Sequence, residues 1–263
     1  MGRLHLAIVV GFCAGCSSPA PVARSPVPPA RPRVTAAPGP VAIPKALEAA
    51  AAAYRGHKTL ANVEAVAAWL EPGMARKEVE RLLGEPDGWD DPSVFYAGDR
   101  ANAAGERVGL TLEYYVWYVD GRAATPSDRL ERWILGSGNR FEAADPKLPR
   151  MAPSPPVDDR AALEPVAAHY RQHRDYASLQ GLVRGLRLGR PRKDVEALLG
   201  APDHCAVEGL PCRYTSERRN AAGLSLGVSV DYRVNNADAP GSRVSERLEA
   251  LTFGPIAPRS DTH

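Results

Sequence analysis

Apolar residues after position 44 recur at steps of three and four, which is the period of an amphipathic helix. These positions are Leu47 and Tyr54, then Leu60, Val63, Val66, Ala67 and Leu70, then Val79, Leu82 and Leu83. Gly84 and Pro86 follow the last segment, and such a pair typically ends a helix. The pattern therefore predicts three helices before residue 87, and the third is short.

Beyond Pro86 the period changes to two. Apolar residues alternate with other residues at Val108, Leu110, Leu112, Tyr114 and Val116. This alternation predicts a half-buried antiparallel strand that runs through Trp117. Residues 93–99 and 129–135 are shorter β-rich segments. We expect an α+β fold in which helices are followed by a three-stranded antiparallel meander and pack on one face of the sheet.

The whole pattern occurs twice. Residues 70–87 match residues 186–203 at an offset of 116, and Asn102 matches Asn220 at an offset of 118. An insertion of two residues between these regions explains the difference. The chain is therefore expected to contain two tandem repeats of one small unit. A function unique to this protein should then lie where the copies differ or where they meet.

The N-terminal region indicates the compartment. Arg3 precedes an apolar run at residues 6–12, and the small residues before Cys16 resemble the lipobox of bacterial lipoproteins. The alternative is an ordinary secretory signal with an incidental cysteine. We expect acylation of Cys16, and Ser17 after it is no obvious inner-membrane retention signal, which favours an outer-membrane lipoprotein on the periplasmic face or the cell surface.

Composition then predicts the domain boundaries. Residues 16–43 are dense in Pro and Ala, so they are expected to form an extended tether. The predicted segments are a signal peptide at 1–15, the tether at 16–43, repeat 1 at 44–144, a Pro-rich linker at 145–157, repeat 2 at 158–256 and a tail at 257–263.

Charge and cysteine content narrow the functional classes. The 33 basic and 31 acidic residues give a net charge of +2, which does not favour nucleic-acid binding. The second copy is richer in arginine, including Arg184 and Arg187, and we interpret these side chains mainly as solvated surface. In an oxidising compartment Cys205 and Cys212 are expected to form a disulfide. A zinc site that includes His204 is the alternative, and it lacks an apparent fourth ligand.

The sequence contains no recognisable catalytic motif. Zinc-protease, P-loop and dinucleotide-binding patterns are all missing from it. The one Gly-x-Ser-x-Gly match, at residues 223–227, runs into the alternating segment of the second copy and lacks the strand-to-helix turn that a nucleophile elbow requires. His169 and His173 are spaced i, i+4 and could bind a metal, but the first copy has Ala53 at the first of these positions. We therefore predict no catalytic residues, no metal, no cofactor and no small-molecule substrate.

Differences between the copies suggest a protein-binding surface. Tyr115 and Trp117 are expected on the outward face of the long strand, where the second copy has polar residues. Exposed Tyr and Trp are enriched at interfaces, so we predict a surface around these two aromatics, with Phe95 or Tyr96 contributing whichever faces the same way. The alternative is that Tyr115 and Trp117 are covered as core.

Residues shared by both copies carry less information, because duplication alone preserves residues. Arg100 recurs as Arg218, and Glu113 recurs as Asp231. We interpret each arginine and acid as a charge pair on the sheet face, in preference to a ligand site.

The motif residues resemble those of a known family. Gly73 and Met74, followed by Val79, Leu83-Gly84 and Pro86 and then a meander in a lipoprotein, resemble the SmpA/OmlA (BamE-like) family of outer-membrane lipoproteins. The resemblance implies a non-enzymatic module that docks to a protein partner in the cell envelope, with a role in outer-membrane assembly or integrity. Tandem copies of such a unit are also similar to β-lactamase inhibitor proteins, which implies the alternative of an inhibitor-type binder of a periplasmic or extracellular enzyme.

Overall fold

The computed structural model describes residues 41–116, 125–138, 141, 145, 147–152, 160–205, 211–234 and 243–256. Its first half begins with helices α1 (Lys45–Gly56), α2 (Leu60–Ala67) and α3 (Arg76–Leu83). Each carries buried apolar residues on one side, as the three- and four-residue spacing predicts. The three predicted helices are therefore confirmed.

Local side chains determine where α2 begins and where α3 ends. The Thr59 hydroxyl accepts a hydrogen bond from the amide of Asn62 at 3.2 Å, and the Asp99 carboxylate accepts one from the amide of Leu60 at 2.8 Å. These caps satisfy backbone donors that have no partner within the helix. Gly84 follows α3 with a φ of 81°, a left-handed conformation that glycine adopts without a steric penalty.

The second half repeats the helical order. Its helices are α4 (Arg160–His173), α5 (Tyr176–Gly185) and α6 (Arg192–Leu199). Gly200 ends α6 with a φ of 79°, in the same way that Gly84 ends α3. The stop signals read from the sequence therefore operate in both halves.

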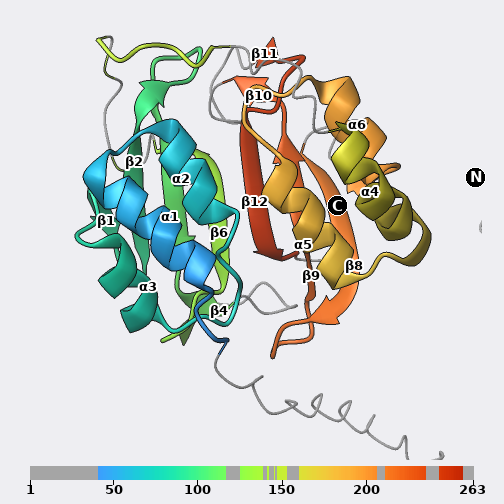
Figure 1. Ribbon diagram of the computed structural model, residues 1–263, viewed down its shortest axis with the longest axis horizontal. Coiled ribbons are helices and arrows are strands. Elements are labelled where there is room, and N and C mark those ends of the chain that lie inside the picture. Colours follow the sequence, from blue (N-terminus) through green and yellow to red (C-terminus); the bar gives the residue numbers. More distant parts are fainter. Residues whose placement is uncertain are drawn as a thin grey trace, which may run out of the picture. The chain divides into compact units, whose positions relative to one another are not determined.

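One antiparallel sheet contains the main strands of both halves, which confirms the α+β class (Figure 1). Its eight strands lie in the order β1 (Gly88–Asp90), β2 (Ser93–Ala101), β3 (Arg107–Glu113), β6 (Arg132–Ser137), β12 (Ala250–Pro255), β9 (Ser225–Asp231), β8 (Cys212–Arg219) and β7 (His204–Cys205). The short edge strands β1 and β7 were not predicted, because two or three residues are too few to show a period.

The long strand predicted through Trp117 is wrong in its last part. Strand β3 ends at Glu113, and β4 (Tyr115–Val116) pairs with β5 (Thr125–Pro126) in a separate two-stranded sheet. The chain leaves the main sheet at Tyr114. The second half has a matching pair, β10 (Arg233–Val234) with β11 (Arg243–Val244).

The helices lie on one side of the sheet, and the aromatic core beneath them spans both halves (Figure 1). The rings of Trp133 and Phe253 are 5.7 Å apart, and Tyr176 lies 5.8 Å from Phe253. Trp133 also donates from its indole nitrogen to the Leu70 carbonyl at 3.2 Å. Because burial of each such side chain stabilises the fold by roughly 1.5 to 3 kcal/mol, this shared core holds the halves together.

The halves of the sheet meet where β6 pairs with β12. The paired residues are Leu135 with Leu251, Ile134 with Thr252, and Trp133 with Phe253. Ile134 and Thr252 are equivalent positions, since their numbers differ by the sequence offset of 118. An antiparallel ladder centred on two equivalent residues has the symmetry of a contact across a two-fold axis.

Candidate functional site

The structure does not place Tyr115 on the main sheet. This residue lies in β4, and its side chain is half-buried. Trp117 lies outside the described residues. An outward position for both aromatics requires an unbroken strand, and the main-sheet strand β3 ends at Glu113. A docking role for Tyr115 and Trp117 stays a prediction without that support.

Phe95 and Tyr96 are both buried, on opposite faces of β2. Tyr96 is 1% exposed within the core beneath the helices. Phe95 faces the other way and is 0% exposed, because its ring stacks on Phe141 at 5.5 Å. A Cβ atom on Gly109 would lie 2.6 Å from the Phe95 ring, so this glycine makes room for it. The prediction that either aromatic is exposed for binding is wrong.

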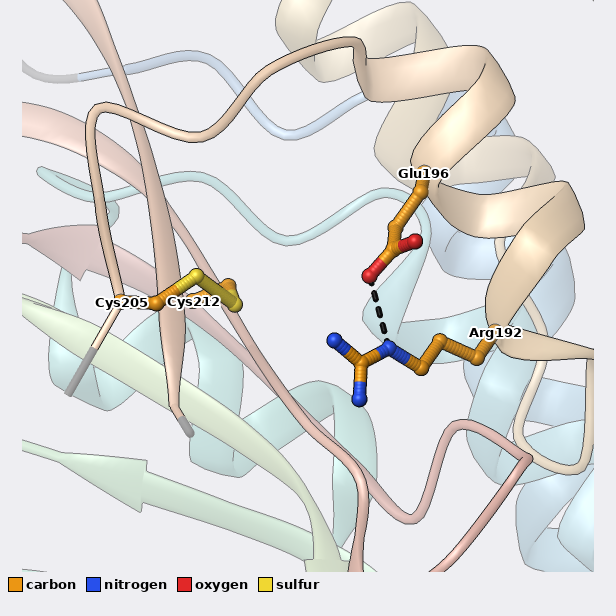
Figure 2. Close-up of a disulfide and its surroundings, with 4 residues drawn as sticks. All are labelled: Arg192, Glu196, Cys205 and Cys212. Carbon is orange, nitrogen blue, oxygen red and sulfur yellow. Dashed lines mark hydrogen bonds and ion pairs between the residues drawn. A yellow bond between two sulfur atoms is a disulfide. The ribbon is translucent and has the colours of Figure 1, made fainter. Parts of the chain in front are cut away.

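The predicted disulfide is present. Cys205 and Cys212 are cross-strand neighbours in β7 and β8, with their Cα atoms 4.1 Å apart (Figure 2). Their bond joins the edge strand to the sheet. Cys16 lies outside the described residues, so its acylation stays a prediction.

An ion pair stacked on a tyrosine recurs in both halves. On α6, Arg192 donates to Glu196 at 2.7 Å (Figure 2). The Arg192 guanidinium lies 5.0 Å from the centre of the Tyr232 ring. In the first half, Arg76 donates to Glu80 at 2.8 Å, and its guanidinium lies 4.8 Å from the centre of the Tyr114 ring. Burial raises the pKa of Tyr232, so this tyrosine stays protonated. Since both halves contain the arrangement, we interpret it as helix-to-sheet packing.

The predicted charge pairs between the recurring arginines and acids are not formed. Glu113 accepts a hydrogen bond from Arg132 at 2.6 Å, and Asp231 accepts one from Arg233 at 2.6 Å. The acids thus pair with near neighbours, in β6 and in β10. Arg100, which was assigned to Glu113, lies at the end of β2, 3.8 Å from Asp99.

Charged side chains connect α5 with the end of α2 where the two halves meet. Arg184 lies 3.7 Å from Glu71 and 4.3 Å from the centre of the Trp69 ring. Its Nε also donates to the Ala68 carbonyl at 3.2 Å. The interpretation of Arg184 as solvated surface is therefore wrong. The first half supplies an acid and an aromatic ring, and the second half supplies the cation.

Glu64 is a second contact across this junction. Its carboxylate accepts a hydrogen bond from the amide of Leu188 at 2.9 Å and lies 3.9 Å from the guanidinium of Arg187. The side chain is only 12% exposed. Burial raises the pKa of the Glu64 carboxyl group, against smaller opposite effects of Leu188 and Arg187. Arg187 thus contributes to the junction as well as to the surface.

A pocket of about 490 Å³ opens beside Glu64 at the junction. Its lining consists of Thr59, Leu60, Ala61, Glu64, Asp99, Arg100, Met151, Ala152, Arg187 and Leu188. Both halves contribute to its wall. This volume lies within the range of about 300 to 1,000 Å³ that is common for ligand sites. No motif in the sequence marks the pocket. One difference between the copies lies at its rim, because Leu60 corresponds to Tyr176 at the offset of 116.

In the part of the chain that the structure describes, no group of three or more His, Cys, Asp or Glu side chains is arranged to hold a metal ion. His169 lies 3.4 Å from Asp175, and its ring centre is 4.4 Å from that of His173. Among the same residues, no helix has the length and apolar character that crossing a membrane requires.

The chain matches no protein-family model, no curated protein and no solved structure. The resemblance to SmpA/OmlA proteins thus depends on the motif residues around Gly73 and Gly84 alone.

Proposed function

We propose that this chain is a lipid-anchored, non-enzymatic protein-binding module of the cell envelope, built from two tandem repeats of one α+β unit. The observation that carries the proposal is the single sheet, which continues through both halves while the helices lie on one side of it (Figure 1). Among the residues that the structure describes, no helix lies on the opposite face, which continues through both halves. Such a surface suits a large protein partner better than a small ligand, which needs a concave site.

A row of cross-strand neighbours crosses this helix-free face. In order along the row, its members are Phe95, Thr111, Ile134, Thr252, Ser229 and Arg213. Phe95 and Thr111 are buried, whereas the four residues from Ile134 onward are half-buried. We therefore place the binding surface on the second half, around Thr252 and Ser229, instead of around Tyr115.

A capture experiment tests this proposal. Crosslinked complexes would be isolated from detergent-solubilised membranes with the wild type and with Thr252→Arg, which adds a bulky charge at the centre of the row. Loss of one interface anchor commonly costs about 2 kcal/mol or more, roughly a thirtyfold loss of affinity. We expect the variant to lose its partner. Ala49→Arg on the exposed side of α1 is the control and should retain the partner; equal capture by all three proteins would contradict the proposal.

The membrane anchor is tested separately. The lipobox resemblance predicts that Cys16 carries the acyl chains and that the outer membrane retains the protein through them. Two or three chains make dissociation from a bilayer negligible. Palmitate should label the wild type and not Cys16→Ser. If both proteins are labelled equally, the anchor at Cys16 is excluded.

The second candidate is an inhibitor-type binder of a periplasmic or extracellular enzyme. Continuity of the sheet across β6 and β12 supports this candidate as well, because a joint surface of both halves suits either kind of protein partner. The same capture experiment distinguishes the two. An enzyme partner that loses its activity when the wild type binds, and keeps it with Thr252→Arg, supports inhibition. A partner without enzymatic activity supports an assembly or integrity role.

A further inference from the structure

Leu60 and Tyr176 occupy the same position in the two halves. Each is the first residue of its helix, α2 or α5, and directly follows the capping residue, Thr59 or Asp175. Their numbers differ by the offset of 116 that relates the two halves in this region. The halves therefore place a leucine and a tyrosine in corresponding surroundings.

The tyrosine ring is held under an arginine in the second half. The Arg218 guanidinium lies 4.4 Å from the centre of the Tyr176 ring, and the Phe253 ring lies 5.8 Å from it. Tyr176 is only 7% exposed. The cation and the ring face attract each other because the face of an aromatic ring carries partial negative charge.

The first half keeps the arginine and lacks the ring. Arg100 corresponds to Arg218 at the offset of 118, and its side chain is 44% exposed with Asp99 at 3.8 Å. Leu60 and Arg100 both line the junction pocket of about 490 Å³. The equivalent positions thus hold an aromatic ring in the second half and line an open pocket in the first half.

The rest of the pocket lining also suits an aromatic side chain. Met151 and Leu188 provide apolar contacts, and thioethers pack well against rings. Glu64 lines the pocket with a carboxylate that accepts one backbone hydrogen bond, which leaves capacity for a hydroxyl donor. Tyrosine therefore matches the lining better than an aliphatic side chain does.

We propose that this pocket binds a tyrosine side chain of a protein partner, with the ring against Leu60 and beneath the guanidinium of Arg100. The pocket is an anchoring site in addition to the helix-free sheet face. The inference rests on the proposed protein-binding function only in taking the natural ligand to be a side chain of a protein. The internal template for the contact is Tyr176 beneath Arg218.

The test is a titration of the purified full chain with N-acetyl-L-tyrosinamide, followed by amide chemical shifts at Leu60, Arg100 and Leu188. A ligand of this size should bind with a Kd on the order of 1 mM. Leu60→Tyr copies the second half and fills the pocket, so it should abolish saturable shifts. Arg100→Gln should weaken binding about two- to fivefold. Arg81→Gln, on the exposed side of α3, is the control and should leave binding unchanged.

Three outcomes would overturn the inference. They are no saturable shifts in the wild type, shifts that persist in Leu60→Tyr, and equal binding of N-acetyl-L-leucinamide, which would mark a generic apolar cavity. Because the ligand is a small molecule, failure here leaves the capture experiment with Thr252→Arg unaffected. Failure of that capture likewise leaves this titration valid.

Discussion

The guanidinium of Arg184 lies 3.7 Å from the carboxylate of Glu71, and the two residues come from different halves of the chain. Position 68 corresponds to Arg184 at the offset of 116, and it is an alanine. Position 187 corresponds to Glu71, and it is an arginine. Equivalent positions therefore carry different charges, so that the first half is complementary to the second and not to another copy of itself.

The first prediction concerns this junction. Arg184→Ala removes a cation–π contact with Trp69, an ion pair and a hydrogen bond to a backbone carbonyl, and should lower the free energy of unfolding by about 1 to 2 kcal/mol. Urea denaturation measures the change. Arg81→Ala removes only an exposed pair with Glu78 and should leave the midpoint nearly unchanged. Equal effects of the two variants would show that Arg184 does not stabilise the junction.

Glu64 gives a prediction about pH. Burial raises the pKa of the Glu64 carboxyl group in the folded state above its value in the unfolded chain. The stability linked to this group is therefore fully present below the unfolded-state pKa and is lost as the pH rises through the folded-state pKa. Glu64→Gln should therefore gain stability relative to the wild type as the pH rises from about 4 to about 7. The lower limit of this range is roughly the ordinary pKa of a glutamate carboxyl group. Gln180 occupies the equivalent position in the second half.

The measurement is the urea midpoint of both proteins at each pH, because the difference between them cancels the titration of all other groups. A difference that stays constant across the range would mean that the carboxyl is not perturbed. A variant that becomes less stable than the wild type as pH rises would mean that the pairing with Arg187 outweighs desolvation.

Phe95 gives a prediction about stability instead of binding. Its ring is fully buried against Phe141 and lies over Gly109, so Phe95→Ala should cost about 3 to 5 kcal/mol. Thermal unfolding measures this loss. Gly109→Ala should also destabilise the protein, because a Cβ atom there would lie 2.6 Å from the ring. A Phe95→Ala variant with unchanged stability would return this residue to the list of interface candidates.

The disulfide gives a prediction about the second half alone. Closing a loop of about eight residues corresponds to roughly 2 to 3 kcal/mol in the chain-entropy model. The double variant Cys205→Ser with Cys212→Ser should lose about that much stability, and the mature wild type should show no free thiol at either position when it is denatured without reductant. Two reactive thiols in that assay would contradict the observed bond.

The sequence predicts the local parts of this fold well. The helices follow from apolar spacing, the ends of α3 and α6 from Gly84 and Gly200, and the disulfide from two cysteines in an oxidising compartment. These signals all lie within a few residues of the structure they determine.

The non-local parts could not be predicted in the same way. Alternation continues through Tyr114 and Val116, although the chain leaves the sheet there to pair with β5. Phe95 faces away from the helices as an exposed residue would, but Phe141 covers it from 46 positions further along the chain. The ladder between Ile134 and Thr252 joins segments with no local sign of pairing.

The central claim is that the helix-free face of the second half binds a protein partner, and photo-crosslinking in cells tests it most directly. A photoreactive amino acid would replace Ser229 on that face or, separately, Ala49 on the exposed side of α1. The account predicts an adduct of one discrete mass from position 229 and none from position 49. An adduct from position 49 together with none from position 229 would contradict it.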